Sequence, residues 1–146
     1  MLFKSAEQLE AFGARLAAVA RAGDVIALYG DLGAGKTTLA RGLLRGLGLD
    51  GEAPRPTFTL VQTYDPPEVR LPVWHCDLYR LDDPEDAIEL GLDEAFDSAL
   101  VLIEWPERLG AFLPRQALRL RLDGAGEAQR RLTAEVPPGW EARWPS

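Results

Sequence analysis

The stretch Asp24-Val-Ile-Ala-Leu-Tyr29, followed at once by Gly30-Asp-Leu-Gly-Ala-Gly-Lys-Thr-Thr38, decides the fold. Its first part is a short apolar run of strand length, and its second part is rich in glycine. Leucines then follow at helical spacing, and Gly48 is a typical helix stop; these leucines are Leu39, Leu43, Leu44 and Leu47. The stretch therefore predicts a strand, a glycine-rich turn and an amphipathic helix in direct succession.

The glycine-rich part of this stretch matches the phosphate-binding loop pattern, Gly30-x4-Gly35-Lys36-Thr37. Glycines allow successive backbone N–H groups to turn inward around phosphates, and the N-terminus of the following helix also favours negative charge. In such loops the lysine contacts the β- and γ-phosphates, and the next hydroxyl ligates Mg²⁺. We therefore expect Lys36 to bind nucleotide phosphates and Thr37 to bind Mg²⁺.

Two carboxylates are candidates for the further oxygen ligands that Mg²⁺ requires. Asp77 ends the stretch Val73-Trp-His-Cys-Asp77, and Glu104 ends the apolar stretch Ala99-Leu-Val-Leu-Ile-Glu104. Enzymes with this loop usually take such a ligand from the end of a neighbouring strand. One carboxylate would hold the metal and the other the attacking water, and the sequence leaves open which does which.

Three other residues near these motifs can be interpreted as structural rather than functional. Thr57 lies in Arg55-Pro-Thr-Phe-Thr-Leu60, where a switch loop that senses the γ-phosphate or the metal often follows the P-loop helix. The same segment is equally consistent with the start of a strand. His75 is interpreted as a structural residue, and Cys76, on the opposite face of its strand, as a core residue.

The rest of the chain continues an alternation of strands and helices. Hairpins are predicted for residues 57–64 with 69–77 and for residues 116–122 with 131–136. A helix capped by Ser5 precedes Gly23, another starts at Pro84 after Asp82 or Asp83, and a short helical turn covers residues 93–97. This order predicts an α/β fold, namely a P-loop NTPase-like three-layer sandwich with a mixed central sheet. Residues 1–146 would form a single P-loop NTPase domain, with an irregular tail at 137–146.

Composition and charge narrow the classes of partner. The chain has 16 basic and 23 acidic residues, a net charge of −7, and no clustered Lys and Arg, so free nucleic acid, DNA included, is a poor partner. The eight acids within residues 82–97 predict a solvated helix face or, alternatively, a docking surface for a basic partner.

No apolar run approaches the ~18 residues of a membrane span, so we expect a cytoplasmic protein without a membrane partner. One cysteine and one histidine exclude an internal disulfide and a Cys/His zinc site.

Four blocks in series resemble the TsaE family, the bacterial ATPases of tRNA threonylcarbamoyladenosine modification. They are Gly-Asp-Leu-Gly-Ala-Gly-Lys-Thr-Thr (30–38), Pro-Thr-Phe-Thr-Leu-Val (56–61), His-x-Asp-Leu-Tyr-Arg-Leu (75–81) and Ile-Glu-Trp-Pro-Glu (103–107). The resemblance covers roughly residues 5–122. The chain departs from the family at Arg55, where a serine is usual, and at Cys76, where an aromatic residue is usual.

The resemblance implies binding and hydrolysis of ATP with Mg²⁺, with hydrolysis weak in the isolated protein and dependent on partners. Those partners would be the TsaD transferase and TsaB, which modify adenosine 37, and tRNA would be contacted only indirectly. Thr37, Glu104 and Asp77 would form the metal site, and Lys36, Glu104 and Asp77 would be the catalytic residues. The nucleotide would contact Gly33, Ala34, Gly35, Lys36, Thr37, Thr38, Thr57 and Trp105.

Three alternatives belong to other classes. A Ras-like GTPase is disfavoured because the guanine-reading Asn-Lys-x-Asp block requires asparagine, which this chain lacks. A small-molecule kinase would use Arg115 and Arg119 as lid residues, although both fit solvent-facing positions in an alternating strand. A nucleotide-binding module without significant hydrolysis would need only the P-loop.

Overall fold

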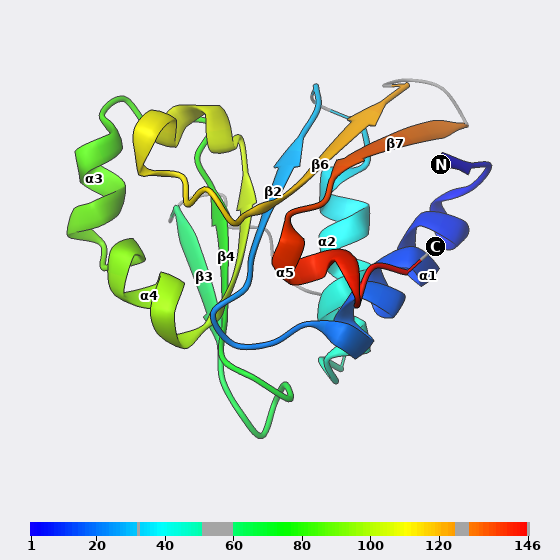
Figure 1. The fold of residues 1–146 in the computed structure, drawn as a ribbon, viewed down its shortest axis with the longest axis horizontal. Coiled ribbons are helices and arrows are strands. Elements are labelled where there is room, and N and C mark those ends of the chain that lie inside the picture. The colour runs from blue at the N-terminus through cyan, green and yellow to red at the C-terminus, as the bar shows by residue number, and fades with distance from the viewer. Residues whose placement is uncertain (32, 51–59, 125–128, 146) are drawn as a thin grey trace.

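The structure, a computed structural model, describes residues 1–31, 33–50, 60–124 and 129–145. They form a seven-stranded sheet in the order β1-β7-β6-β2-β5-β4-β3 (Figure 1). β4, β5, β2 and β6 are parallel neighbours, whereas β3, β7 and β1 pair antiparallel, so the predicted mixed sheet is confirmed. The strands are β1 (Leu2–Phe3), β2 (Val25–Tyr29), β3 (Val61–Tyr64), β4 (Val73–Asp77), β5 (Leu100–Glu104), β6 (Leu118–Asp123) and β7 (Arg130–Glu135).

The two central strands are buried on both faces. All five residues of β5 and the first four of β2 are buried, as expected for parallel strands with helices on either side. In β6, by contrast, leucines alternate with arginines and aspartate, and only the leucines are buried. The two predicted hairpins are confirmed, because β3 pairs with β4 and β6 pairs with β7.

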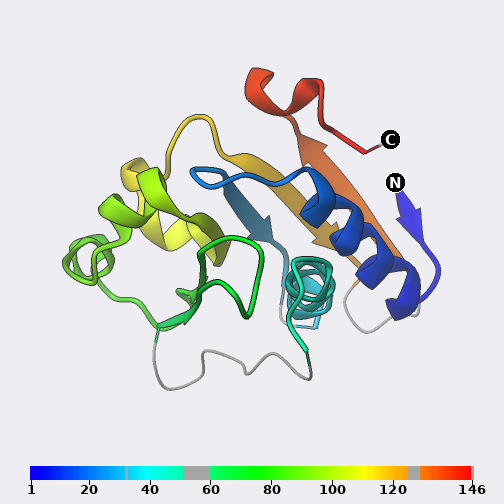
Figure 2. The same ribbon diagram turned by 90° about the horizontal axis from the view of Figure 1, so that it is seen from below.

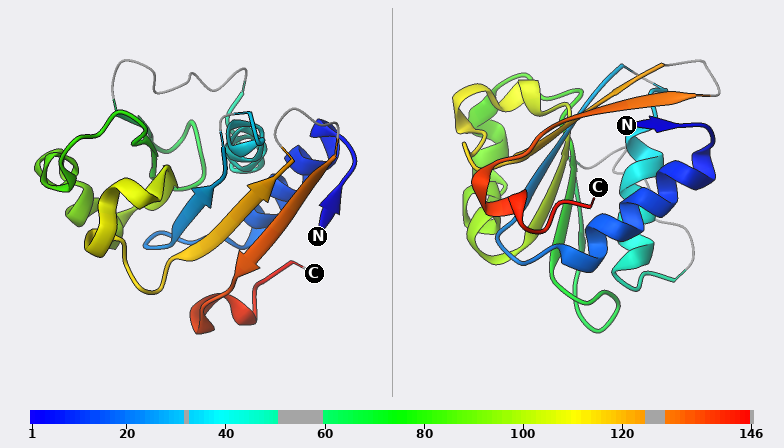
Figure 3. Two further views of the ribbon diagram at one scale, coloured as in Figure 1. Left: turned by 90° about the horizontal axis from the view of Figure 1, so that it is seen from above. Right: turned by 45° about the vertical axis from the view of Figure 1, so that its right-hand side comes forward.

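Helices cover opposite faces of the sheet, which gives the predicted three layers (Figures 2 and 3). The helices α1 (Ala6–Val19) and α2 (Lys36–Gly46) pack on the face that carries Leu28, Leu102 and the leucines of β6. The other face carries Val101 and Ile103. It is covered by α3 (Pro84–Glu89), α4 (Leu92–Ser98) and a 3₁₀ segment, η1 (Pro106–Phe112), interrupted at Gly110. None of the helices in the described part of the chain is long and apolar enough to cross a membrane.

Local sequence signals begin two of the helices. The Ser5 hydroxyl accepts a hydrogen bond from the backbone N–H of Gln8 at 3.2 Å, as the predicted cap requires. Asp83, not Asp82, caps α3, because its side chain accepts from the backbone N–H of Glu85 at 3.0 Å. A close contact between helices explains one glycine, since a Cβ at Gly13 would lie 2.5 Å from the carbonyl oxygen of Leu39.

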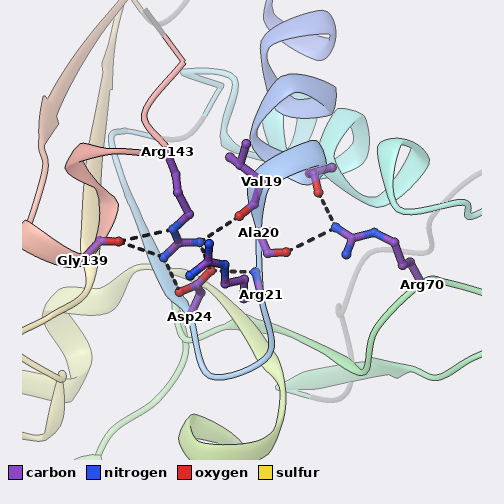
Figure 4. Close-up of polar contacts among 8 residues, drawn as sticks. Val19, Ala20, Arg21, Asp24, Arg70, Gly139 and Arg143 are labelled. Carbon is purple, nitrogen blue, oxygen red and sulfur yellow. Dashed lines mark hydrogen bonds and ion pairs between the residues drawn. The ribbon is translucent and has the colours of Figure 1, made fainter.

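The tail at 137–146 is not irregular as predicted. It contains a helical turn, α5 (Pro138–Glu141), and Trp140 is only 2% exposed in the main core. Arg143 forms two hydrogen bonds with the Asp24 carboxylate, at 2.7 and 3.0 Å, and donates to the carbonyl of Val19 at 2.8 Å (Figure 4). The tail therefore stabilises the C-terminal end of α1, where helix carbonyls lack partners.

Arg70 reaches the same end of α1 from the segment between β3 and β4. Its guanidinium donates to the carbonyls of Ala17 at 2.6 Å and Ala20 at 3.2 Å (Figure 4). A cation at a helix C-terminus also interacts favourably with the helix dipole. Two arginines from distant parts of the chain thus satisfy the last turn of α1.

We expect Arg143→Ala to lower the free energy of unfolding by about 2–3 kcal/mol, because it leaves the half-buried Asp24 carboxylate without its charged partner. Urea unfolding monitored by circular dichroism measures the change. Arg21→Ala is the matched control, because the hydrogen bonds of Arg21 with Asp24 use only the backbone atoms of Arg21. Equal stability of the two variants would contradict this role of the tail.

Candidate active site

The candidate site lies where parallel strands end and α2 begins. β2 and β5 pair so that Leu28 lies beside Glu104, and β5 and β4 pair so that Glu104 lies beside Asp77. The carboxyl ends of these strands therefore lie at one edge of the sheet. The loop after β2 leads at this edge into the N-terminus of α2 (Figure 1).

The loop between β2 and α2 has the backbone that a phosphate-binding loop needs. Gly33 and Gly35 are left-handed, with φ of 82° and 107°, a conformation that favours glycine. At Gly35 a Cβ would also lie 2.8 Å from Cδ2 of the buried Leu9, so that a larger residue would require the Leu9 side chain to move. The first N–H groups of α2 have no partner within the helix, so this N-terminus is suited to bind an anion.

Lys36 is the first residue of α2 and is only 4% exposed. Its ammonium donates to the carbonyl of Gly30 at 2.6 Å and lies 3.8 Å from the ring centroid of Trp105. Burial lowers the pKa of Lys36 below its ordinary value, and the nearby carboxylates of Glu104 and Asp77 oppose this shift. The cation is thus held in a desolvated position, where its electrostatic interactions are stronger than in water.

Glu104 connects the loop to the sheet. The Thr37 hydroxyl donates to Oε1 of Glu104 at 3.4 Å, and the His75 ring contacts Oε2 at 2.7 Å. Glu104 is 4% exposed and His75 is 2% exposed, so both groups are removed from water. His75, interpreted from the sequence as structural, therefore lies in direct contact with a predicted site residue.

Asp77 is at the same edge but is less enclosed. Its Oδ1 accepts from the backbone N–H of Tyr79 at 3.1 Å, and the side chain lies beside Glu104 in the strand register. Burial raises the pKa of Asp77 above its ordinary value; the Tyr79 hydrogen bond lowers it, and the charge of Glu104 raises it further. No hydrogen bond joins Asp77 to Thr37 or to Glu104 within the described ranges.

Two contacts at the site involve residues that the sequence analysis did not single out. The Tyr79 ring lies 4.9 Å from the Trp105 ring, and the position of Tyr79 in the block that ends in Leu81 could have suggested it. Arg130, which belongs to β7, donates a hydrogen bond to the carbonyl of Gly33 at 3.4 Å. No sequence signal indicates this contact between residues that are far apart in the chain. Thr57, the predicted switch residue, lies outside the described residues.

The donors present fit Mg²⁺ when phosphate oxygens complete the coordination. A hydroxyl from Thr37 and a carboxylate from Glu104 are hard oxygen ligands in contact with one another, with Asp77 on the next strand. Among the described residues, no group of three His, Cys, Asp or Glu side chains could hold a metal by itself. Mg²⁺ is usually bound through one or two carboxylates plus phosphates and water, so a large carboxylate cluster is not required.

Comparison with known proteins agrees with this geometry. Residues 3–132 match the family model described as "Threonylcarbamoyl adenosine biosynthesis protein TsaE". The chain belongs to the TsaE family. Relatives with the name "tRNA threonylcarbamoyladenosine biosynthesis protein TsaE" include one from Bacillus subtilis, 39% identical over 87% of this chain and 78% of the relative. Another, from Streptomyces coelicolor, is 40% identical over 90% of both chains.

The TsaE-family assignment extends to the three-dimensional structure. The crystal structure of Bacillus subtilis YdiB superposes with a TM-score of 0.79 at 34% identity and covers 98% of this chain and 88% of that one. The covered part includes nearly the whole sheet, so the predicted P-loop NTPase-like fold is confirmed.

We expect Lys36→Ala to weaken ATP binding by on the order of 10²-fold, because a charge-assisted bond to phosphate in a desolvated site contributes up to about 3 kcal/mol. Calorimetry with ATP and Mg²⁺ measures the affinity. Arg45→Ala, which removes one positive charge from the last turn of the same helix, is the matched control. Unchanged affinity in Lys36→Ala would reject the loop as the nucleotide site.

Proposed function

We propose that this TsaE-family protein binds ATP with Mg²⁺ and hydrolyses ATP in support of the threonylcarbamoylation of adenosine 37 in tRNA. The names of its relatives support a role in this process. The observation that carries the nucleotide chemistry is the contact of Thr37 with Glu104 beside the buried Lys36. A phosphate-binding loop, a hydroxyl and a carboxylate in contact form the set that phosphoryl transfer to water requires.

Each residue has a part in this proposal. The backbone of residues 33–38 and the Lys36 ammonium bind the β- and γ-phosphates. Thr37 and Glu104 would hold Mg²⁺, which would supply positive charge next to the phosphates. The Thr37–Glu104 contact supports assigning the metal to Glu104, which leaves Asp77 to orient the attacking water. The partly buried Asp77 has a raised pKa, and a more basic carboxylate is a better acceptor of a proton from water.

The alternative of a small-molecule kinase lacks support from its proposed lid. The guanidinium of Arg119 donates to the carbonyls of Arg115 and Ala117, each at 3.3 Å, at the start of β6. Because β6 runs parallel to β2, its start lies at the opposite edge of the sheet from Lys36. Arg119 therefore stabilises the turn before β6, away from the phosphate-binding loop.

The protein partners in threonylcarbamoylation, which we propose to be TsaD and TsaB, would be recruited through protein contacts. The acids of residues 82–97 are all exposed, and none forms an ion pair with another described residue. This acidic face covers α3 and α4. Unpaired surface carboxylates repel the tRNA backbone and attract a basic protein surface.

We expect Glu104→Gln to slow ATP hydrolysis by on the order of 10²-fold or more, because it removes a charged metal ligand, while ATP binding largely survives through the loop. Phosphate release in the presence of TsaD and TsaB measures the rate, and calorimetry measures binding. Asp77→Asn is measured in parallel to separate the metal from the water role. Turnover at the wild-type rate in Glu104→Gln would move the catalytic role to Asp77. Absence of hydrolysis in the wild type with both partners would favour a non-hydrolysing module.

We expect binding to the TsaB–TsaD pair to weaken as salt rises, because exposed charges are screened over ~10 Å at 0.1 M. At low salt the double variant Glu85→Gln/Glu89→Gln should bind about 3- to 10-fold more weakly. Glu7→Gln/Glu141→Gln, which removes two exposed acids outside the acidic face, is the control. Equal loss in both variants, or tight binding of tRNA by the isolated protein, would contradict the docking surface.

A further inference from the structure

The chain's one histidine is buried against the carboxylate of Glu104. Nε2 of His75 lies 2.7 Å from Oε2 of Glu104. The other ring nitrogen, Nδ1, is buried and has no hydrogen-bond partner among the described residues. The only polar contact of this imidazole in the described part of the chain is therefore the one to Glu104.

Burying the polar ring of His75 at this position is unfavourable in free energy. Val73 and Leu102, buried apolar residues, lie on the same face of the sheet, and burying a polar group with an unpaired nitrogen is unfavourable. An ionised carboxylate only accepts hydrogen bonds, so the proton at this contact is on Nε2. A leucine or valine would fill such a position without an unpaired nitrogen, so packing alone does not account for the imidazole.

The two oxygens of Glu104 consequently have different surroundings. Oε2 is fixed by the histidine, and Oε1 faces the Thr37 hydroxyl at 3.4 Å. We propose that His75 is a positioning residue, which holds the Glu104 carboxylate in one orientation so that Oε1 is presented to the metal beside Thr37. This inference rests on the proposed binding of ATP with Mg²⁺. It goes beyond that proposal by giving a role to a residue outside the set that contacts nucleotide or metal.

His75 would raise metal affinity because a carboxylate that is free to rotate loses conformational entropy when it binds a metal. Without His75, the only other side-chain hydrogen bond of Glu104 within the described ranges is the long one to Thr37. A metal-ligating side chain that becomes ordered only on binding lowers the affinity for the metal, whereas a side chain that is already ordered does not. Groups that hydrogen-bond to a metal ligand typically change metal affinity by 10- to 100-fold.

A spectroscopic test uses the native protein without any substitution. Because the chain has one histidine, its ring nitrogens give one unambiguous set of long-range ¹H–¹⁵N NMR signals. We expect a proton on Nε2, and a shift of the Nε2 signal when Mg²⁺ is added to the protein with a non-hydrolysable ATP analogue. An Nε2 without a proton, or no change on addition of Mg²⁺, would overturn the proposal.

A matched pair of variants tests the metal affinity. The amide nitrogen of glutamine can reach the position of Nε2, whereas that of asparagine reaches only that of Nδ1. With the analogue bound, electron paramagnetic resonance of free Mn²⁺ should show an affinity about 10- to 100-fold lower in His75→Asn and within about 3-fold of wild type in His75→Gln. Analogue affinity without metal should be unchanged in both. Cys76→Ala, which removes a buried group on the opposite face of β4, should lower the unfolding midpoint without changing Mn²⁺ affinity.

The outcomes separate this inference from the proposed function. If the wild-type protein binds neither the analogue nor Mn²⁺, the proposed function fails. If it binds both and His75→Asn retains wild-type Mn²⁺ affinity, His75 is only a core residue and this inference fails. If His75→Asn does not fold, the NMR measurement on the native protein decides.

Discussion

The parallel pairing of β2 with β5 is the constraint on which the site depends. The register places Leu28 beside Glu104, so the strand that enters the glycine loop ends beside the strand that carries the carboxylate. Side chains alternate between faces, and a slip of one residue would turn Glu104 into the layer of α3, α4 and η1, where Ile103 now packs. Burial on both faces prevents such a slip, because it would also expose or misplace the whole apolar sets of β2 and β5.

The buried cation at Lys36 links the two halves of the molecule. Its helix, α2, belongs to the core with α1, whereas the Trp105 ring beneath its ammonium packs against the core of α3, α4 and η1. Removing an ammonium from water is unfavourable, and here the Gly30 carbonyl, the aromatic face and neighbouring carboxylates offset that cost. Trp105 directly follows β5, at a turn where its backbone has a left-handed φ of 60°.

Local patterns predicted most of the fold, because they depend on residues that are close in sequence. The apolar run before Gly30, the cap at Ser5 and the alternation of residues 118–123 each specify an element without knowledge of the rest. The tail was mispredicted for the opposite reason. Trp140 is buried among core residues that come from distant parts of the chain, and Arg143 contacts Asp24, which lies 119 residues earlier in the sequence.

In the candidate site, too, residues in local motifs could be predicted, whereas a contact between distant strands could not. Lys36 and Thr37 follow from a contiguous motif, and Glu104 from its place after an apolar strand. The pairing of His75 with Glu104 depends on the alignment of β4 with β5, because His75 lies beside Leu102 and meets a carboxylate two residues further along the neighbouring strand. A periodicity within one strand carries no information on that alignment, so a sequence reading places His75 in the core without naming its partner.

The acidic face and the candidate site share one structural layer. The buried residues Ala87 and Leu92 attach α3 and α4 to the core against which Trp105 packs, and the Tyr79 ring contacts Trp105 from the segment before α3. A protein bound to the exposed side of α3 and α4 would therefore press on the layer that holds the aromatic ring under Lys36. Close-packed interiors transmit such displacements because side chains have little free space to absorb them. The acidic face and the buried Lys36 ammonium are thus connected by continuous packing through Trp105.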